Sequence, residues 1–146
     1  MKRLLIGIVL AVTFGAVMAG CAAAQAATPK PTDPLVSIHA EGGLCVYGGC
    51  SRDVTVLQNG TYTVKDGSGK TTSSALDDAT LGQLKQAIDE ADFDAIRAKP
   101  FTDTCPIAYD GQEYTFTFYK ASGATEVVDS CRAALDMSSV MFKVDY

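Results

Sequence analysis

The sequence contains one histidine, His39, and its 12 lysines and arginines are outnumbered by 17 aspartates and glutamates. One histidine excludes a metalloprotease motif that needs two histidines on one helix. The sequence has no G-x-S-x-G segment, so a Ser-His or Cys-His catalyst would depend on His39 alone. An acidic chain without a basic cluster is a poor candidate for binding nucleic acid. We therefore expect a non-catalytic protein with no metal, no cofactor and no nucleic-acid partner.

The N-terminal segment has the order of a secretion signal. Lys2 and Arg3 precede the apolar run Leu4–Val17, and small residues lead to Cys21. This order resembles the lipobox of bacterial lipoproteins, which implies that residues 1–20 are a signal peptide and that Cys21 carries the lipid. The resemblance implies a protein held by lipid on the extracytoplasmic side of the cell membrane or the outer membrane.

An uncleaved membrane anchor is the alternative interpretation of the same segment. Residues 4–27 carry no charge, and a stretch of that length can cross a hydrocarbon core as one helix. Both interpretations place the rest of the chain on the same side of the membrane. Loss of residues 1–20 would remove Lys2 and Arg3 and change the formal charge from −5 to about −7.

Composition divides the remaining chain into a tether and one domain. Residues 22–34 read AAAQAATPKPTDP, and alanine, threonine and proline without an apolar pattern are typical of a flexible linker. We assign residues 21–34 to the lipidated cysteine and its tether. Residues 35–146 then form a single domain by size.

Alternating residues predict strands on both sides of one main helix. Residues 35–40 are a short β-like run, and Asn59-Gly60 joins two alternating runs as a hairpin turn. Strands are predicted at 53–58, 61–65, 113–120 and 125–129, with a further one possible at 70–76. The main helix is expected to start at Asp77 as its N-cap and to bury a stripe of residues with helical spacing, Leu81, Leu84, Ile88 and Ala91.

The helical pattern continues after a short break and returns near the C-terminus. Phe93 and Ile96 extend the buried face before Pro100 ends any helix. A short last helix is predicted at residues 137–144, with core candidates Val140, Met141 and Val144. The order β-β-(β)-α-β-β-α predicts an α+β fold. Its mainly antiparallel sheet would have four to five strands, with one long and one short helix.

Four cysteines follow Cys21, and in an oxidising compartment an even number indicates two disulfides. Four cysteines allow three pairings, of which we favour Cys45–Cys50 and Cys105–Cys131. A redox role for the first pair is the weaker reading, because redox motifs place two residues between the cysteines at a helix start. A zinc site of four thiolates is equally weak outside the cytoplasm.

Tyr47 is the candidate partner-binding residue. It lies between Cys45 and Cys50 in a glycine-rich loop, where a disulfide would fix an aromatic side chain with little ordering entropy to lose on binding. The alternative is that Tyr47 folds back onto the sheet. The carboxylates at the end of the main helix read as a solvated helix end or as a calcium site, although their spacing differs from the twelve-residue calcium loop; they are Asp89, Glu90, Asp92 and Asp94.

Several of these motifs together resemble lipoprotein-type domains of unknown function in bacterial envelopes. The motifs are the Cys45-x-x-x-x-Cys50 loop, the Asn59-Gly60 hairpin, Leu81-x-x-Leu84, Ala91-Asp92-Phe93 and Thr104-Cys105-Pro106. The helix ending in Ala-Asp-Phe is also similar to emfourin-like inhibitors of thermolysin-type metalloproteases. The resemblances imply a membrane-anchored binding domain, in one version a protease inhibitor, with an extracytoplasmic protein as partner. The alternative is a structural or accessory lipoprotein of an envelope assembly.

Overall fold

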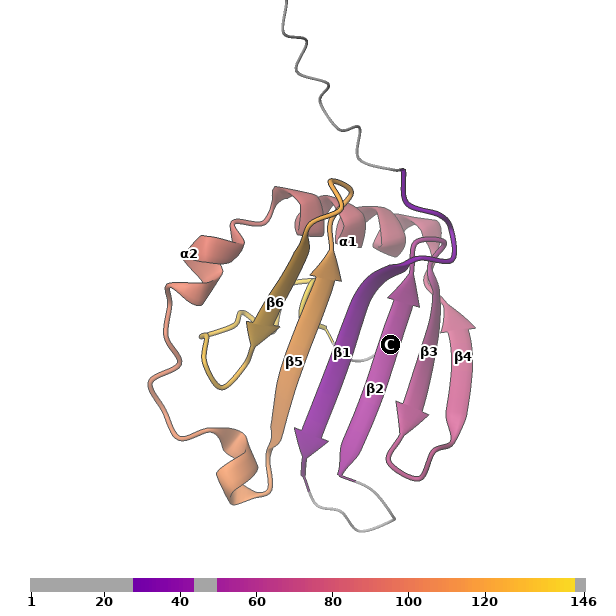
Figure 1. Cartoon of the computed structure of the whole chain (residues 1–146). Helices are drawn as coiled ribbons and strands as arrows, with labels where there is room; N and C mark the ends of the chain where they lie inside the picture. Colours follow the sequence, from indigo (N-terminus) through magenta and orange to yellow (C-terminus); the bar gives the residue numbers. More distant parts are fainter. Residues whose placement is uncertain (1–27, 44–49, 144–146) are drawn as a thin grey trace, which may run out of the picture.

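A computed structural model describes residues 28–43 and 50–143. Six antiparallel strands form one sheet in the order β4-β3-β2-β1-β5-β6 (Figure 1), which confirms the predicted α+β class. The described elements, in chain order, are β1 (Pro34–Gly42), β2 (Ser51–Leu57), β3 (Thr61–Asp66), β4 (Thr71–Ala75), α1 (Asp78–Glu90), α2 (Phe93–Arg97), the 3₁₀ turn η1 (Pro106–Tyr109), β5 (Gln112–Tyr119) and β6 (Thr125–Asp129).

The predicted count of four to five strands is wrong, because the run at residues 35–40 is part of a full central strand. β1 pairs with β2 on one side and with β5 on the other. Ile38 lies opposite Val54 in the first ladder and opposite Phe116 in the second. β5 follows both helices in the chain and is distant from β1 in sequence. No local sequence pattern therefore predicts that the two strands pair.

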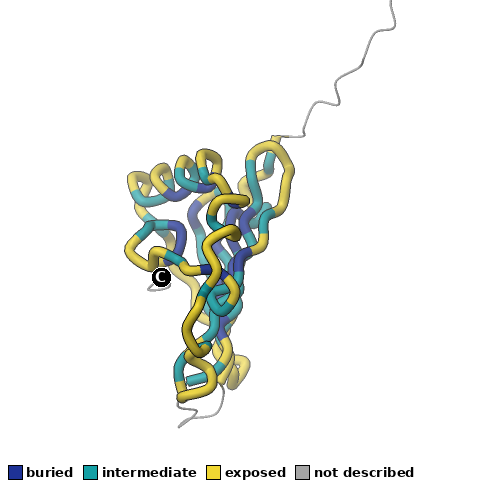
Figure 2. The backbone as a smooth tube through the Cα atoms, turned by 90° about the vertical axis from the view of Figure 1, so that its left-hand side faces the viewer, coloured by how far each residue is buried: buried dark blue, intermediate teal, exposed yellow. Residues whose placement is uncertain are grey.

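One face of the sheet holds the core. The alternation along β5 buries Phe116 and Phe118, and the stripe of α1 brings Leu84 and Ile88 onto the same face. Figure 2 shows the sheet edge-on with the helices on one side only. Each such buried side chain contributes about 1.5–3 kcal/mol of transfer free energy, so this face supplies most of the hydrophobic stabilisation.

Aspartate caps start both helices. The Asp77 carboxylate accepts from the Thr80 backbone N–H at 2.8 Å, which confirms the predicted start of the main helix. Asp92 accepts from the Ala95 N–H at 2.9 Å and starts α2 after the break. Phe93 is buried there, with its ring centroid 5.2 Å from that of Phe118. The predicted continuation of the buried face is therefore correct.

The predicted last helix is wrong for the described part of residues 137–144. Residues 137–142 form turns, in which the Ser139 N–H donates to the Asp136 carbonyl and the Phe142 N–H to the Ser139 carbonyl. The Asp136 carboxylate also accepts from the backbone N–H and hydroxyl of Ser138. Such a side-chain acceptor offers the backbone an alternative to helical bonds. Met141 and Phe142 are nevertheless buried, and Val140 packs partly against the core. Val144 lies outside the described residues.

The other face of the sheet is open in the described chain and is rich in hydroxyl groups. Its middle row crosses all six strands in register and consists of Ser73, Thr63, Thr55, Ser37, Thr117 and Val127. No described helix lies on this face (Figure 2). The polar row explains why the sheet tolerates this exposure, since an antiparallel sheet can face water on one side.

The segment before β1 is attached to the β2–β3 turn. Gln58 N–H donates to the Asp33 carbonyl at 2.9 Å, and Asn59 N–H donates to the Pro31 carbonyl at 3.0 Å. Composition alone places residues 28–33 in the predicted tether. In the structure they are joined to the sheet by backbone hydrogen bonds, so the packed part of the described chain begins before Leu35.

Candidate functional site

The two ends of β1 define two different regions of the molecule. Pro34 begins the strand beside the segment that follows Thr28, and Gly42 ends it at the opposite end of the sheet (Figure 1). The 3₁₀ turn η1 lies at this far end, next to the start of β5. Its side chains Ile107 and Tyr109 are 42% and 75% exposed. An exposed aromatic side chain and an exposed aliphatic side chain on one short turn are typical of a protein contact.

Several contacts hold η1 against the sheet. Cys105, just before the turn, forms a disulfide with Cys131, just after β6, at a Cα–Cα distance of 5.2 Å. A Cβ atom on Gly42 would lie 2.8 Å from the Ile107 Cγ1 atom, so the end of β1 and η1 approach closely only because residue 42 is glycine. The exposed side chains therefore sit on a fixed turn and lose little backbone entropy on binding.

An apolar groove of about 280 Å³ adjoins η1. Its polar groups include Tyr114 and Gln112, whose side chains are hydrogen-bonded at 2.6 Å. Met137 lies at the groove and is 42% exposed. The groove is lined by Phe101, Pro106, Gln112, Tyr114, Ser130, Ala134, Leu135 and Met137. We call this groove, with Ile107 and Tyr109, the far-end surface.

The candidate residue Tyr47 lies outside the described residues, as do Cys21 and Cys45. The described residues on either side of its loop meet at the far end, where Gly42 N–H donates to the Cys50 carbonyl at 2.7 Å. The Cys45–Cys50 pairing and the role of Tyr47 stay predictions, whereas the Cys105–Cys131 pairing is confirmed. Sequence reasoning missed Ile107 and Tyr109, although both follow Cys105-Pro106 closely.

His39 lies on the open face between two carboxylates. Its Nδ1 is 2.6 Å from Asp53 Oδ1 on β2, and its Nε2 is 2.9 Å from Glu41 Oε1 on β1, the strand of His39 itself. The hydrogen bonds to Asp53 and then to Glu41 raise the pKa of His39 above its ordinary value. Both ring nitrogens thus face carboxylates rather than a serine hydroxyl or a thiol, an arrangement suited to holding a proton.

Glu113 extends this group of acids on the neighbouring strand. It lies directly opposite Glu41 in the β1–β5 ladder. Desolvation first, and the Asp129 carboxylate second, raise the pKa of Glu113. The ligand atoms of Cys105, Glu113 and Cys131 also lie within 4.8 Å of one another. The two Sγ atoms are bonded to each other, so this set offers no thiolate to a metal.

We expect His39→Gln to destabilise the protein more at pH 5.5 than at pH 8. A raised folded-state pKa gives stability that is complete below the unfolded value of about 6.5 and is lost as pH rises through the folded value. The exposed pairs should contribute less than about 1 kcal/mol. Urea unfolding at the two pH values measures the difference, with Ser37→Ala on the same face as control. An equal effect of His39→Gln at both pH values would contradict this assignment.

The acidic residues at the helix ends have separate local partners. Asp89 accepts from the Ala121 N–H at 3.1 Å, Asp92 caps α2, and Asp94 pairs with Arg97 at 2.6 Å. Glu90 accepts from the Gln86 amide at 2.9 Å. These contacts explain the acids as caps and surface pairs and give no support to a shared calcium site.

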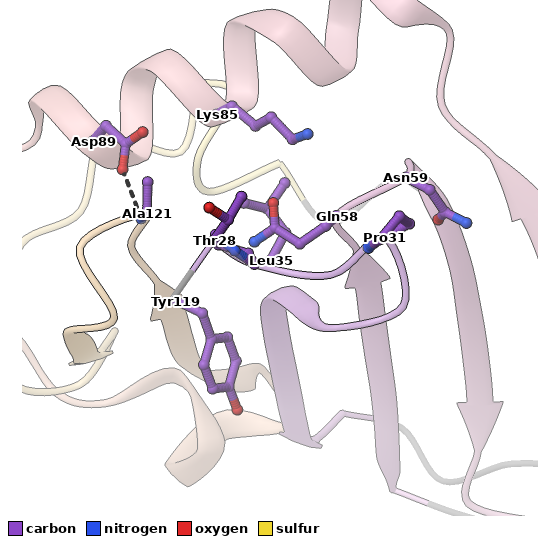
Figure 3. A pocket seen from close by; sticks show the side chains of 10 residues that line it. Thr28, Pro31, Leu35, Gln58, Asn59, Lys85, Asp89, Tyr119 and Ala121 are labelled. Carbon is purple, nitrogen blue, oxygen red and sulfur yellow. Dashed lines mark hydrogen bonds between the residues drawn. The ribbon is translucent and has the colours of Figure 1, made fainter. Parts of the chain in front are cut away.

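A second cavity lies near the N-terminal end of β1 (Figure 3). It measures about 440 Å³ and is bounded on one side by α1, from which Lys85 and Asp89 project, and on the other by the segment Thr28–Pro31. Tyr119 and Leu35 form part of the apolar lining. Because Thr28, Pro29 and Pro31 line this cavity, it lies where the segment before β1 packs against the domain.

Comparison with protein-family models, curated proteins and solved structures found no match. The resemblances to envelope lipoproteins and to emfourin-like inhibitors therefore stay predictions. Within the described ranges, no helix is long and apolar enough to cross a bilayer.

Proposed function

We propose that this protein is an extracytoplasmic lipoprotein, anchored at Cys21, whose domain binds another protein without catalysing a reaction. The observation that carries the proposal is the far-end surface. It combines exposed Ile107, Tyr109 and Met137 with an adjoining apolar groove on a turn that a disulfide holds. Aromatic residues on rigid elements contribute strongly to protein interfaces.

The position of this surface supports binding to a partner in the envelope. It lies at the end of the sheet opposite Thr28, where the chain enters from the anchor side (Figure 1). Gly43 and Cys50, the described residues on either side of the segment that contains Tyr47, lie at the same end. Within one copy, the binding end and the point of attachment would thus lie at opposite ends of the sheet.

Site-specific photo-crosslinking in the intact, anchored protein tests the proposal. A photoreactive residue at position 109 should give a defined heterologous product, whereas one at Ser122 should not. Ser122 is a suitable control because it is also exposed but lies in the β5–β6 turn at the other end of the sheet. Equal products from both positions, or none from position 109, would refute the far-end surface. A protease as the product favours an inhibitor, and an envelope complex favours an accessory role.

Tyr109→Ala should then weaken capture of that product by about 5- to 30-fold, the usual range for an aromatic anchor worth 1–2 kcal/mol. The free energy of unfolding should change by less than about 0.5 kcal/mol, because Tyr109 is 75% exposed. Binding is measured by titration and stability by urea unfolding. Unchanged affinity would exclude Tyr109 as an anchor, and a large loss of stability would show that it packs in the native state.

A further inference from the structure

The two edges of the sheet are protected differently. At the β6 edge, α2 lies alongside the strand, and Arg97 donates to Glu126 at 2.8 Å (Figure 1). At the other edge, β4 pairs with β3, and no other described strand lies on its outer side. All five residues of β4 are exposed. An edge of this kind is a template for a further strand.

The hydrogen bonds of the β3–β4 hairpin show which groups face outward. Asp66 N–H donates to the Lys70 carbonyl, and Leu76 N–H donates to the Gly60 carbonyl, both at 3.0 Å. In antiparallel pairs, hydrogen-bonded and non-hydrogen-bonded positions alternate. The backbone groups that point away from β3 are therefore those at alternate positions, namely Thr71, Ser73 and Ala75.

The side chains of β4 do not block pairing of this edge with a further strand. Its sequence is Thr-Thr-Ser-Ser-Ala, without charge or proline, and the β3–β4 register is continuous. Natural edge strands are commonly blocked by a lysine, a proline or a bulge. The uncharged edge is unusual in an acidic protein and leaves the outward backbone groups accessible.

We propose that β4 pairs with β4 of a second copy of this chain in antiparallel orientation around a two-fold axis at Ser73. In this register Ser73 faces Ser73 of the other copy, and Thr71 faces Ala75 of the other copy. The outward backbone groups of all three residues therefore face outward backbone groups of the second β4. Each such pair exchanges two bonds, which gives about six backbone hydrogen bonds. The interface is isologous, the arrangement of most homodimers.

Charges at the ends of β4 favour a second copy over an unrelated acidic strand. Lys70 precedes the strand, and Asp77 and Asp78 follow it. In the antiparallel register the Lys70 end of one β4 meets the end of the other copy that carries Asp77 and Asp78, so opposite charges lie at the same end of the joined strands, twice over. A parallel pairing would bring like charges together, which disfavours it.

The two-fold axis also fixes how the pair can be anchored. The axis is perpendicular to the sheet, so the open faces of the two copies lie on the same side of the joined sheet. The Thr28 end of one copy and the Thr28 end of the other lie at opposite ends of this sheet. Residues 22–27 span at most about 20 Å, less than the roughly 30 Å length of a nine-residue strand. If Cys21 carries the lipid, as proposed above, both anchors reach one bilayer when the sheet lies along the membrane.

Cysteine crosslinking in the full-length, membrane-associated protein tests the pairing. Ser73→Cys should form a disulfide-linked dimer, because facing residues have Cα atoms about 5.5 Å apart, within disulfide range. Thr71→Cys is the matched control on the same strand, since its two copies would lie more than about 13 Å apart. We expect at least about tenfold more dimer from Ser73→Cys than from Thr71→Cys on non-reducing gels.

Mixed copies sharpen the test of register. Differently tagged Thr71→Cys and Ala75→Cys chains, expressed together, should crosslink to each other and not to themselves. Equal dimer from Ser73→Cys and Thr71→Cys, or none from Ser73→Cys, would overturn the pairing. A product of Ser73→Cys with another protein would assign the edge to a foreign strand and also overturn it. Neither result depends on the partner of the far-end surface, so the two proposals fail separately.

Discussion

Cys21→Ser is expected to abolish lipid attachment completely. The cysteine after the basic head and apolar run is the only residue of this segment that could carry a thioether-linked lipid. Each buried methylene contributes about 0.8 kcal/mol to membrane binding, so loss of the acyl chains would either release the protein or leave it stranded in the membrane by an uncleaved residue 4–27 segment. Incorporation of a labelled fatty acid measures attachment, and N-terminal sequencing shows whether residues 1–20 are removed.

Ala22→Ser is the matched control, because it changes the neighbouring residue and keeps Cys21. It should incorporate label as the wild type does. A Cys21→Ser protein that is still labelled and still cleaved after Gly20 would refute the lipoprotein assignment. A wild type that never incorporates label and retains residues 1–20 would support the transmembrane alternative, since residues 4–27 carry no charge.

Phe118→Ala is expected to have the largest effect on folding, a loss of about 3–5 kcal/mol. The Phe118 side chain is fully buried, and its ring centroid lies 5.2 Å from that of Phe93 and 5.9 Å from that of Phe142. It therefore joins β5, α2 and the C-terminal segment in one contact. A typical domain is stable by only about 5–15 kcal/mol, so this variant would be marginal. Urea unfolding followed by circular dichroism measures the loss.

Thr117→Ala is the control for this experiment, because Thr117 precedes Phe118 on the same strand and points to the open face. It should cost less than about 1 kcal/mol. If Phe118→Ala does not fold, Phe118→Leu, a smaller change in volume, should still unfold measurably earlier than Thr117→Ala. Similar losses for positions 117 and 118 would mean that the strand is not buried on one face.

Local chemistry explains which parts of the fold could be predicted from the sequence. Asp77 as a cap, the Asn59-Gly60 turn and the alternation around Phe116 are set by neighbours in the chain, and all three occur in the structure. The place of residues 35–40 at the centre of the sheet depends on β5, which is distant in sequence. Residues 137–142 form turns through short-range backbone bonds, from the Ser139 N–H to the Asp136 carbonyl and from the Phe142 N–H to the Ser139 carbonyl, which the apolar spacing of this segment does not indicate.

The candidate site was predicted less completely than the fold, for a related reason. Tyr47 stands out because two cysteines and several glycines surround it in the sequence. No comparable sequence pattern surrounds Ile107 and Tyr109. Their exposure follows from the contact of η1 with Gly42 at the end of β1. His39 could be identified as unique, but its two carboxylate neighbours meet only once β1 and β2 pair.

The entry of the chain through β1 has a mechanical consequence. If Cys21 carries the lipid and the domain binds a partner, as proposed above, the chain is pulled from its N-terminal side whenever that partner moves relative to the membrane. The force would then act on β1. This strand is hydrogen-bonded to β2 on one side and to β5 on the other. A pull along this strand must shear two sets of hydrogen bonds together, whereas an edge strand would peel away one bond at a time. The hydrogen bonds that the Pro31 and Asp33 carbonyls accept from the β2–β3 turn would break first. A small force would therefore be carried by these bonds before it acts on the strands of the sheet.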